Sequence, residues 1–376
     1  MMKTYRVVVC GTLFGQVYLS AFKRQFPGFE LAGILARGSE RSLTIAKEYG
    51  VPLYREVSEL PDDIDIACVV VRSAIVGGAG SQLARALLEK GIHVLQEHPV
   101  YEKDVVECLK LARKNGCYYQ INTHYPNVPA VRHFVEYLKK ARETQQPCFI
   151  EATCGVQVIC GLLDMLGQAL GGVTPFEFHS NVDWSEVRKL KSELLPPYQI
   201  IHGVFAGIPL ILKIQNQLDP DDPDNHFHIM HRITVGLPSG NLVLVNTHGP
   251  VLWNRAFHIP RTPEENGVRE LLDKQQAPEF YQPASCEFLY QEMPSLEEII
   301  DEHWPEAIRT ALHGMVSNIE SPNPTSAQFL LGQASVWRSL MGCIGNPEVI
   351  SAQEPMLTSP SIEDWLVEYH QESENA

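Results

Sequence analysis

The sequence predicts an α/β fold in two parts: a parallel sheet flanked by helices, then a second domain with a large, mostly antiparallel open sheet. Three observations predict it. Short β-branched runs alternate with stretches of helical periodicity over the first third of the chain, which indicates βαβ units. From about Thr123 the strand-like runs become longer. The 376 residues exceed one ordinary domain and suit two.

Residues 1–122 are assigned to a Rossmann-type dinucleotide-binding domain, because strands and helices alternate there with short turns between them. Strands are predicted over residues 5–11, 29–37, 64–71, 92–97 and 117–122. Helices are predicted between them, over residues 16–26, 39–50, 81–91 and 105–116.

Residues 123–345 are assigned to a second, α+β domain, and residues 346–376 to an acidic, poorly patterned tail. Strand-like runs cover residues 147–155, 175–184, 210–218, 226–238 and 241–249, and an amphipathic helix is expected over 325–345. The turn "LPSGN" between the last two runs predicts a hairpin, and with it a largely antiparallel sheet.

The composition argues against several kinds of partner. The formal net charge is −15 and the pI is near 5.4, so the surface repels nucleic acid and anionic membranes. The nine cysteines are scattered without CxxC spacing, which is typical of reduced thiols, and no signal-peptide layout precedes the first strand. We therefore expect a cytoplasmic protein that binds neither nucleic acid nor membrane.

The turn after the first strand has features of a nucleotide site. In "VVVCGTLFGQVYL" the residues between strand and helix are Gly11, Thr12, Leu13, Phe14 and Gly15. Helix N–H groups and the helix dipole would meet a pyrophosphate there. Only two of the three fingerprint glycines are evident, so a plain strand–helix turn is the competing interpretation.

The end of the second strand selects the cofactor. An NAD site places an acidic residue there for the ribose hydroxyls, but this strand ends at Ala36, followed by Arg37, Ser39 and Arg41. Arginine and serine bind a 2′-phosphate, which a carboxylate would repel. The sequence therefore predicts NADPH, with Arg37 a better ligand than Arg41. A solvated basic turn is the alternative.

Two further strand ends carry polar residues where a nicotinamide ring and its substrate would lie. The run "IACVVV" ends at Val71 and leads into Arg72 and Ser73. The run "IHVL" leads into Glu97, His98 and Pro99, and the proline fixes a backbone bend.

The segment "GIHVLQEHP" resembles the "GKHVLxEKP" signature of the Gfo/Idh/MocA oxidoreductases, which pair a Rossmann domain with a C-terminal open-sheet domain. The resemblance implies that Glu97 touches the nicotinamide ribose. The family's lysine, a general acid/base in its sugar dehydrogenases, is His98 here. If Asp164 in "VQVICGLLDMLGQALG" matches the family's last Asp, its earlier Asp and His become Gln157 and Gly161. Two groups used in alcohol chemistry are then missing.

Longer motifs resemble a narrower branch, the thiazolinyl imine reductases of siderophore assembly lines. They are "RSAIVGGAGSQLARALLEKGIHVLQEHPV", "NTHYPNVPAVRHF" and "CGVQV" with "LLDMLGQALGG". The resemblance implies NADPH-dependent reduction of a thiazoline to a thiazolidine, on an aryl-thiazoline chain held by a nonribosomal peptide synthetase carrier domain. It also implies a homodimer formed through the open sheet, and proton donors at Tyr125 and His98.

The required chemistry suits these two residues. Reduction of a C=N bond needs hydride at carbon and a proton at nitrogen. Tyr125 ranks first because a neutral phenol is fully protonated at pH 7. His98 ranks second and would otherwise orient substrate or tune the tyrosine, and His124 is a weaker third. The structural alternatives are a tyrosine packed at a domain junction and a histidine bonded to backbone.

Other interpretations stay open. A sugar or cyclitol dehydrogenase is the alternative enzyme, and a non-catalytic NADP-binding regulator is the alternative outside enzymes. His226, His228 and His231 lie close in sequence, but no further ligand cluster accompanies them, so no metal is expected. Trp184 and Trp253 are candidates for an aryl pocket, with core packing as the alternative.

Overall fold

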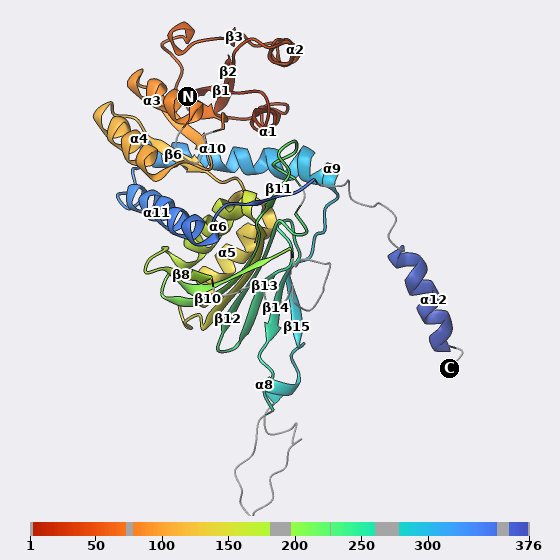
Figure 1. The fold of residues 1–376 in the computed structure, drawn as a ribbon. Helices are drawn as coiled ribbons and strands as arrows, with labels where there is room; N and C mark the ends of the chain where they lie inside the picture. Colours follow the sequence, from red (N-terminus) through yellow and green to blue (C-terminus); the bar gives the residue numbers. More distant parts are fainter. Residues whose placement is uncertain are drawn as a thin grey trace, which may run out of the picture.

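The computed structural model describes residues 3–72, 78–180, 197–225, 227–259, 278–351 and 361–374. Two large sheets lie one beyond the other, and two long helices, α10 (Trp304–Glu320) and α11 (Ser326–Ile344), run between them (Figure 1). The α/β fold predicted from the sequence, a Rossmann-type domain followed by an open-sheet domain, is confirmed.

The first sheet has the strand order β3-β2-β1-β4-β5-β6, and all its strands are parallel. They are β1 (Tyr5–Cys10), β2 (Phe29–Leu35), β3 (Leu53–Tyr54), β4 (Ile66–Val69), β5 (His93–Glu97) and β6 (Tyr119–Asn122). The strand order reverses between β1 and β4. Ligands of such sheets bind beyond the carboxyl ends of the strands at this switch point.

Helices connect these strands: α1 (Gly15–Ser20), α2 (Glu40–Tyr49), α3 (Ala79–Glu89) and α4 (Glu102–Lys114), with a short turn η1 (Val57–Glu59). The helix predicted over residues 16–26 ends at Ser20 instead. The chain then turns so that the ring of Phe26 stacks on Phe29, with ring centroids 4.3 Å apart. Burial of these aromatic rings outweighs the helical periodicity of the segment.

The second sheet has the order β15-β14-β13-β12-β7-β10-β9-β8, and among these strands only the β7–β10 pair is parallel. The strands are β7 (Phe149–Gly155), β8 (Glu177–Ser180), β9 (Gln199–Phe205), β10 (Ile208–Gln215), β12 (His231–Leu237), β13 (Gly240–Leu244), β14 (Val251–Arg255) and β15 (Cys286–Tyr290). The expected hairpin joins β12 to β13, with Leu237 opposite Gly240. The run predicted as a strand from residue 226 begins only at His231.

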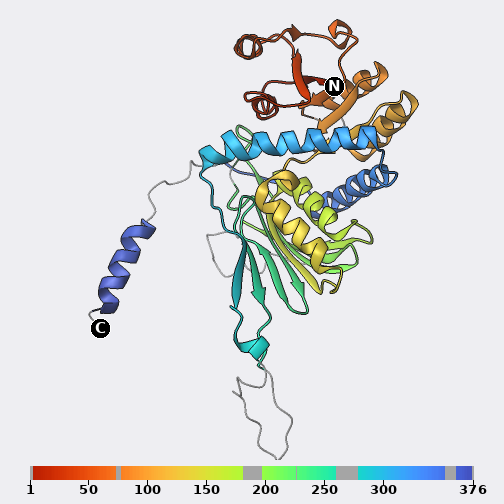
Figure 2. The same ribbon diagram turned by 180° about the vertical axis from the view of Figure 1, so that it is seen from behind.

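Helices α5 (Pro129–Ala141) and α6 (Ile159–Leu170) cover one face of the second sheet (Figures 1 and 2). The apolar side chains of α5 recur at helical spacing, and they join sheet residues such as Ile233 and Leu242 in one buried cluster. The opposite face of the sheet has no helix over it in the described part of the chain.

Helices α10 and α11 contribute to the cores of both domains. Ile308 and Leu312 of α10 are fully buried in a cluster with Val7 and Ile34 of the first sheet. Leu330 of α11 joins the cluster on the other face of that sheet, whereas Trp337 joins the core of the second domain. The Rossmann sheet is therefore covered partly by helices from late in the chain.

The remaining elements are short or lie near the carboxyl end. They are η2 (Tyr125–Asn127), η3 (Val156–Val158), β11 (Gln217–Leu218) paired with β16 (Glu348–Val349), α8 (Pro278–Tyr281), α9 (Leu296–Glu298), the π-helical turn η4 (Ile299–His303) and α12 (Ile362–Glu374). Over the residues that the structure describes, none of the helices combines the length and apolar character that crossing a membrane requires.

Candidate active site

A cavity of about 670 Å³ opens beyond the carboxyl ends of β1, β2 and β4. Gly11 lies at its floor with φ of +97°, and a Cβ there would lie 2.5 Å from the Val70 carbonyl oxygen, so only glycine fits. The predicted cofactor residues that line this cavity are Gly11, Thr12, Leu13, Ala36, Arg37, Ser39, Val71 and Arg72.

The other predicted cofactor residues lie elsewhere. Gly15 begins α1 and is buried, and the ring of Phe14 lies 6.2 Å from Trp304, centroid to centroid. Ser73 falls outside the described residues. Glu97 and His98 follow β5 at the neighbouring strand end.

Several arginines line the cavity. Arg37, Arg41 and Arg55 line it, and none of the three forms an ion pair with a residue in the described ranges. Arg55 follows β3, and its guanidinium packs against Gly38. We did not predict Arg55 from the sequence, because only strand pairing brings the end of β3 beside the end of β2. In a chain of net charge −15, this concentration of unpaired positive charge favours an anionic ligand.

The fourth arginine of this cavity, Arg72, has a partner from the second domain. Its Nη2 lies 2.6 Å from Oδ1 of Asp224, in the acidic segment between β11 and β12. Gln157 supports the same segment, because its amide donates hydrogen bonds to the carbonyls of Gln217 and Asn225. The two domains therefore meet across the mouth of the cavity.

Glu97 ends β5, and its side chain is 12% exposed. The Tyr18 hydroxyl donates a hydrogen bond to Glu97 Oε2, and Asn122 Nδ2 donates to the same hydroxyl at 2.6 Å. Burial disfavours the charged form and raises the pKa of Glu97 to about 8, although the Tyr18 hydrogen bond acts in the other direction.

His98 lies between Glu97 and the second domain. Its Nε2 is 3.5 Å from Glu97 Oε1, and its Nδ1 is buried without a hydrogen-bond partner among the described residues. Burial lowers the pKa of His98 to about 4, so the imidazole is neutral near pH 7. The structure thus brings Glu97 and His98 together.

Tyr125 is 8% exposed and lies among three histidine side chains. Centroid distances from its ring are 6.4 Å to His98, 5.5 Å to His124 and 4.8 Å to His231. Burial raises the pKa of the Tyr125 phenol well above 10, so it is protonated at neutral pH. The two predicted proton donors, Tyr125 and His98, are therefore neighbours.

The residue at position 161 explains how Tyr125 fits. A Cβ on Gly161 would lie 2.4 Å from Tyr125 Cδ2, so the tyrosine ring fills the space that any larger residue would need. The sequence shows only that a histidine expected from the resemblance is missing there. The structure shows that Tyr125 packs in its place.

His124 and His231, the other two histidines around Tyr125, are also neutral near pH 7. Burial lowers the pKa values of His124 and His231 to about 3. Both ring nitrogens of His231 are engaged, by Thr247 Oγ1 at 3.0 Å and the Val158 carbonyl at 2.9 Å, which indicates a structural role. His226 lies outside the described residues, and within them no group of three or more His, Cys, Asp or Glu side chains could hold a metal.

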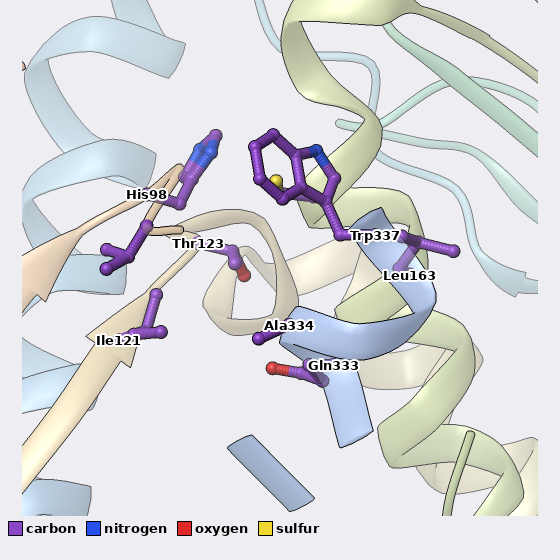
Figure 3. A pocket seen from close by; sticks show the side chains of 9 residues that line it. His98, Ile121, Thr123, Leu163, Gln333, Ala334 and Trp337 are labelled. Atoms are coloured by element: carbon purple, nitrogen blue, oxygen red, sulfur yellow. The ribbon is translucent and has the colours of Figure 1, made fainter. Parts of the chain in front are cut away.

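A small cavity of about 30 Å³ lies on another side of His98, between the first sheet, α6 and α11 (Figure 3). His98 and Trp337 face each other across it, and Thr123 and Gln333 line its wall. Thr123 and Gln333 both donate hydrogen bonds to Asp164, at 2.5 and 2.6 Å. Asp164 therefore ties α6 to the strand end of β6 and to α11.

Of the two tryptophans named from the sequence, only Trp253 lies within the described residues, and it packs away from this site. Trp253 is buried in the core of the second domain, with its ring 5.6 Å from Tyr137 between centroids. Trp184 lies outside the described residues.

Two family models match the chain. Residues 5–123 match the Gfo/Idh/MocA oxidoreductase family, NAD-binding Rossmann fold. Residues 145–254 match the C-terminal domain of thiazolinyl imine reductases, Irp3-like. No curated protein matches the chain.

Solved structures resemble the whole chain at low identity. A mutant of KijD10, a 3-ketoreductase from Actinomadura kijaniata in complex with TDP-benzene and NADP, has a TM-score of 0.62 and 13% identity, covering 93% of this chain and 100% of that one. UDP-N-acetylglucosamine 3-dehydrogenase from Acidithiobacillus ferrooxidans has a TM-score of 0.60 and 12% identity, covering 92% and 100%. An oxidoreductase from Agrobacterium radiobacter, in complex with NAD+, L-tartaric acid and magnesium, has a TM-score of 0.62 and 10% identity, covering 91% and 97%. At these identities the likeness establishes the fold alone.

Proposed function

We propose a specific reaction for this chain, which is a Gfo/Idh/MocA-like oxidoreductase with the C-terminal domain of a thiazolinyl imine reductase. The reaction is NADPH-dependent reduction of a thiazoline C=N bond to a thiazolidine. The substrate is an aryl-thiazoline siderophore intermediate tethered to a carrier domain of a nonribosomal peptide synthetase.

The neutral phenol of Tyr125 beside His98 is the observation that carries this proposal. A C=N bond accepts hydride at carbon while its nitrogen takes a proton, so the site needs a donor that is protonated at neutral pH. Tyr125 meets this condition because burial raises its pKa. An alcohol dehydrogenase needs a base instead, and the buried imidazole of His98 has its pKa lowered to about 4.

The 670 Å³ cavity fits a nicotinamide dinucleotide phosphate. Arg37, Arg41 and Arg55 would hold the 2′-phosphate, and Ala36 stands where an NAD site has an acidic residue. Glu56 also lines the cavity, so three arginines outnumber one carboxylate there. The Ser39 hydroxyl accepts a hydrogen bond from the Ser42 backbone and so caps α2. When bound, the cofactor supplies the hydride. The remaining steps belong to the protein: Tyr125 gives its proton to the ring nitrogen, and Gly161 leaves room for the phenol.

The test follows NADPH absorbance with a soluble aryl-thiazoline, and then with the carrier-bound chain. We expect NADPH consumption, with NADH much slower. Silence with both substrates would contradict the reductase assignment, and turnover of sugar nucleotides or cyclitols instead would favour the dehydrogenase alternative.

Substitution of Tyr125 by Phe separates an enzyme from a regulator. We expect a loss of roughly 10²–10⁴-fold in turnover, because a positioned acid contributes that much. NADPH affinity, measured by fluorescence titration, should change by no more than about twofold. That is well below the tenfold change that corresponds to about 1.4 kcal/mol of binding free energy. An unchanged rate would contradict the role of Tyr125 as donor.

We also propose that the chain forms a homodimer through the uncovered face of the second sheet. The residues of one row across this face pair in register: Phe288 with Leu252, Val243 with Thr234, and Glu151 with Ile211. Phe288, Glu151 and Ile211 are exposed, and the other three are half-buried. Phe288 and Ile211 are large exposed apolar side chains, which are typical of an interface. Light scattering should give twice the monomer mass, and Ile211→Lys should return the monomer.

A further inference from the structure

Glu97 is a largely buried carboxyl, with its side chain 12% exposed, and its surroundings contain no positive charge among the described residues. Tyr18 from α1 and Asn122 from β6 contact it through the Tyr18 hydroxyl. The other titratable groups that face it are Cys68 of β4, Cys160 of α6, Tyr125 of η2 and its neighbour His98. Burial raises the pKa values of both thiols, so they are neutral as well.

His98 is placed to connect Glu97 with Tyr125. One ring nitrogen, Nε2, is 3.5 Å from Glu97 Oε1. The other, Nδ1, is buried and has no hydrogen-bond partner among the described residues, and the ring lies 6.4 Å from the ring of Tyr125 between centroids. A neutral imidazole can accept a proton at one nitrogen and release one from the other.

We infer that Glu97 is the proton reservoir that restores Tyr125 after each turnover, with His98 as the relay between them. This inference rests on the proposed function. Tyr125 loses its O–H proton to the thiazoline nitrogen and becomes a phenolate. His98 gives the Nδ1 proton to the phenolate and takes one at Nε2 from the Glu97 carboxylic acid. Water then protonates Nδ1 of His98, and the Nε2 proton returns to the Glu97 carboxylate. Both residues regain their starting forms, and one solvent proton is consumed in each cycle.

Among the described residues, other titratable groups that face Tyr125 include His124, His231 and Asp224. His124 and His231 are neutral near pH 7 because burial lowers their pKa values to about 3. Both ring nitrogens of His231 are already engaged. Glu97 differs because burial raises its pKa to about 8, so it holds its proton in much of the population at pH 7.

The first test compares the first turnover with later ones in Glu97→Gln, using rapid-mixing NADPH absorbance with the thiazoline. Glutamine keeps the size of the side chain and an oxygen that accepts the Tyr18 hydroxyl. We expect a first turnover close to the wild-type rate, because Tyr125 is already protonated, followed by a steady state at least tenfold slower. Glu97→Asp should recover part of the steady state. Tyr125→Phe should lose the first turnover too.

Three results would overturn the relay. They are an unchanged steady state in Glu97→Gln, an equal slowing of its first turnover, and a large loss of NADPH affinity with normal turnover at saturation. The last would instead support contact with the nicotinamide ribose.

A second test does not depend on activity. Infrared difference spectroscopy of the wild-type protein between pH 6 and pH 9 should show a carboxylic acid C=O band that disappears as pH rises, and that is absent in Glu97→Gln. Asp164→Asn is the matched control, because Asp164 is a buried carboxyl held by Thr123, Gln168 and Gln333. The Glu97 band should persist in that variant. If the Glu97 band is present but the protein does not reduce thiazolines, the result would support Glu97 as a proton reservoir and contradict the proposed function. If the band is absent at pH 6, Glu97 does not hold a proton, and the inference is overturned.

Discussion

Two neighbouring regions at the strand ends of the first sheet differ in the charge of their side chains. The nucleotide cavity is rich in positive charge, because Arg37, Arg41 and Arg55 line it without ion-pair partners in the described ranges. The region around Tyr125 excludes charge, because burial favours the neutral forms of His98, His124 and Glu97. An anion is recognised best by fixed positive charge, whereas a proton donor keeps its proton where charge is penalised. The same sheet edge therefore presents positive charge in one place and neutral titratable groups in the other.

Lowering the pH should destabilise the folded protein through the uncharged region around Tyr125, and this is the largest effect that we expect. The pKa values of His98, His124 and His231 lie below the unfolded value of 6.5, so the unfolded chain binds more protons as pH falls. Their contribution to stability is complete above pH 6.5 and is lost as pH falls towards 4 and 3. Protonation of Glu97, whose pKa is raised to about 8, acts in the opposite direction and offsets part of this loss. Each pKa unit corresponds to about 1.4 kcal/mol, and three histidines oppose one carboxyl, so we expect a net loss of several kcal/mol by pH 4.

The measurement is chemical denaturation from pH 7 to pH 4, compared with His124→Phe. A phenyl ring suits this position, because His124 is 1% exposed and meets Tyr125 and Trp304 edge to face. The variant should lose stability less steeply on acidification. Parallel curves for the two proteins would contradict a neutral buried His124.

Substitution of Gly161 by Ala should disturb the same region by a smaller amount. The new Cβ would lie 2.4 Å from Tyr125 Cδ2, so the ring must move. We expect a destabilisation of about 1–3 kcal/mol from overpacking, and a loss of up to roughly 10²-fold in kcat from misplacing the donor. NADPH affinity should be unchanged.

Gly342→Ala provides the control, because Gly342 lies within α11 with nothing within 4 Å of the added Cβ. That variant should be stabilised by about 0.5–1 kcal/mol. Equal behaviour of the two variants would mean that the Tyr125 ring moves without consequence.

Substitution of Arg55 by Ala tests whether the positively charged cavity binds the 2′-phosphate. A charge-assisted hydrogen bond to phosphate is worth about 1.5–3 kcal/mol, so we expect at least a tenfold weaker NADPH affinity. NADH affinity, which involves no 2′-phosphate, should stay nearly constant. Calorimetric titration with both cofactors measures the difference, and an equal loss for both would place Arg55 outside the phosphate site.

Substitution of Asp224 by Asn should have the smallest effect. Its ion pair with Arg72 is exposed, and exposed pairs contribute about 0–1 kcal/mol. We expect stability to change by less than about 1 kcal/mol and cofactor affinity to rise slightly, because a carboxylate leaves the mouth of an anion site. A marked destabilisation would show that the pair holds the two domains together.

The sequence predicted the parts of the molecule that are set by local pattern. The parallel sheet followed from apolar runs such as that of β4, and the β12–β13 hairpin followed from its turn. Tyr125 and His98 could be named together only through a resemblance to a known family, because twenty-six positions separate them in the chain. The structure shows that they are neighbours.

Other features depend on tertiary packing and leave no local trace. Arg55 reaches the cofactor cavity because β3 pairs with β2, and the raised pKa of Glu97 comes from elements far apart in the chain. The shortened α1 likewise reflects packing of Phe26 on Phe29. Periodicity reports which residues prefer burial, and it does not report which neighbours bury them.

The packing of α10 and α11 has a consequence for synthesis of the chain. The last strand of the first sheet ends at Asn122, but apolar side chains that cover this sheet, such as Ile308 and Leu330, are translated much later. At roughly 5–20 residues per second, a ribosome needs many seconds to reach them. During that interval the nascent amino-terminal half carries uncovered apolar surface, so we expect it to be a client of ribosome-associated chaperones until residue 344 has emerged.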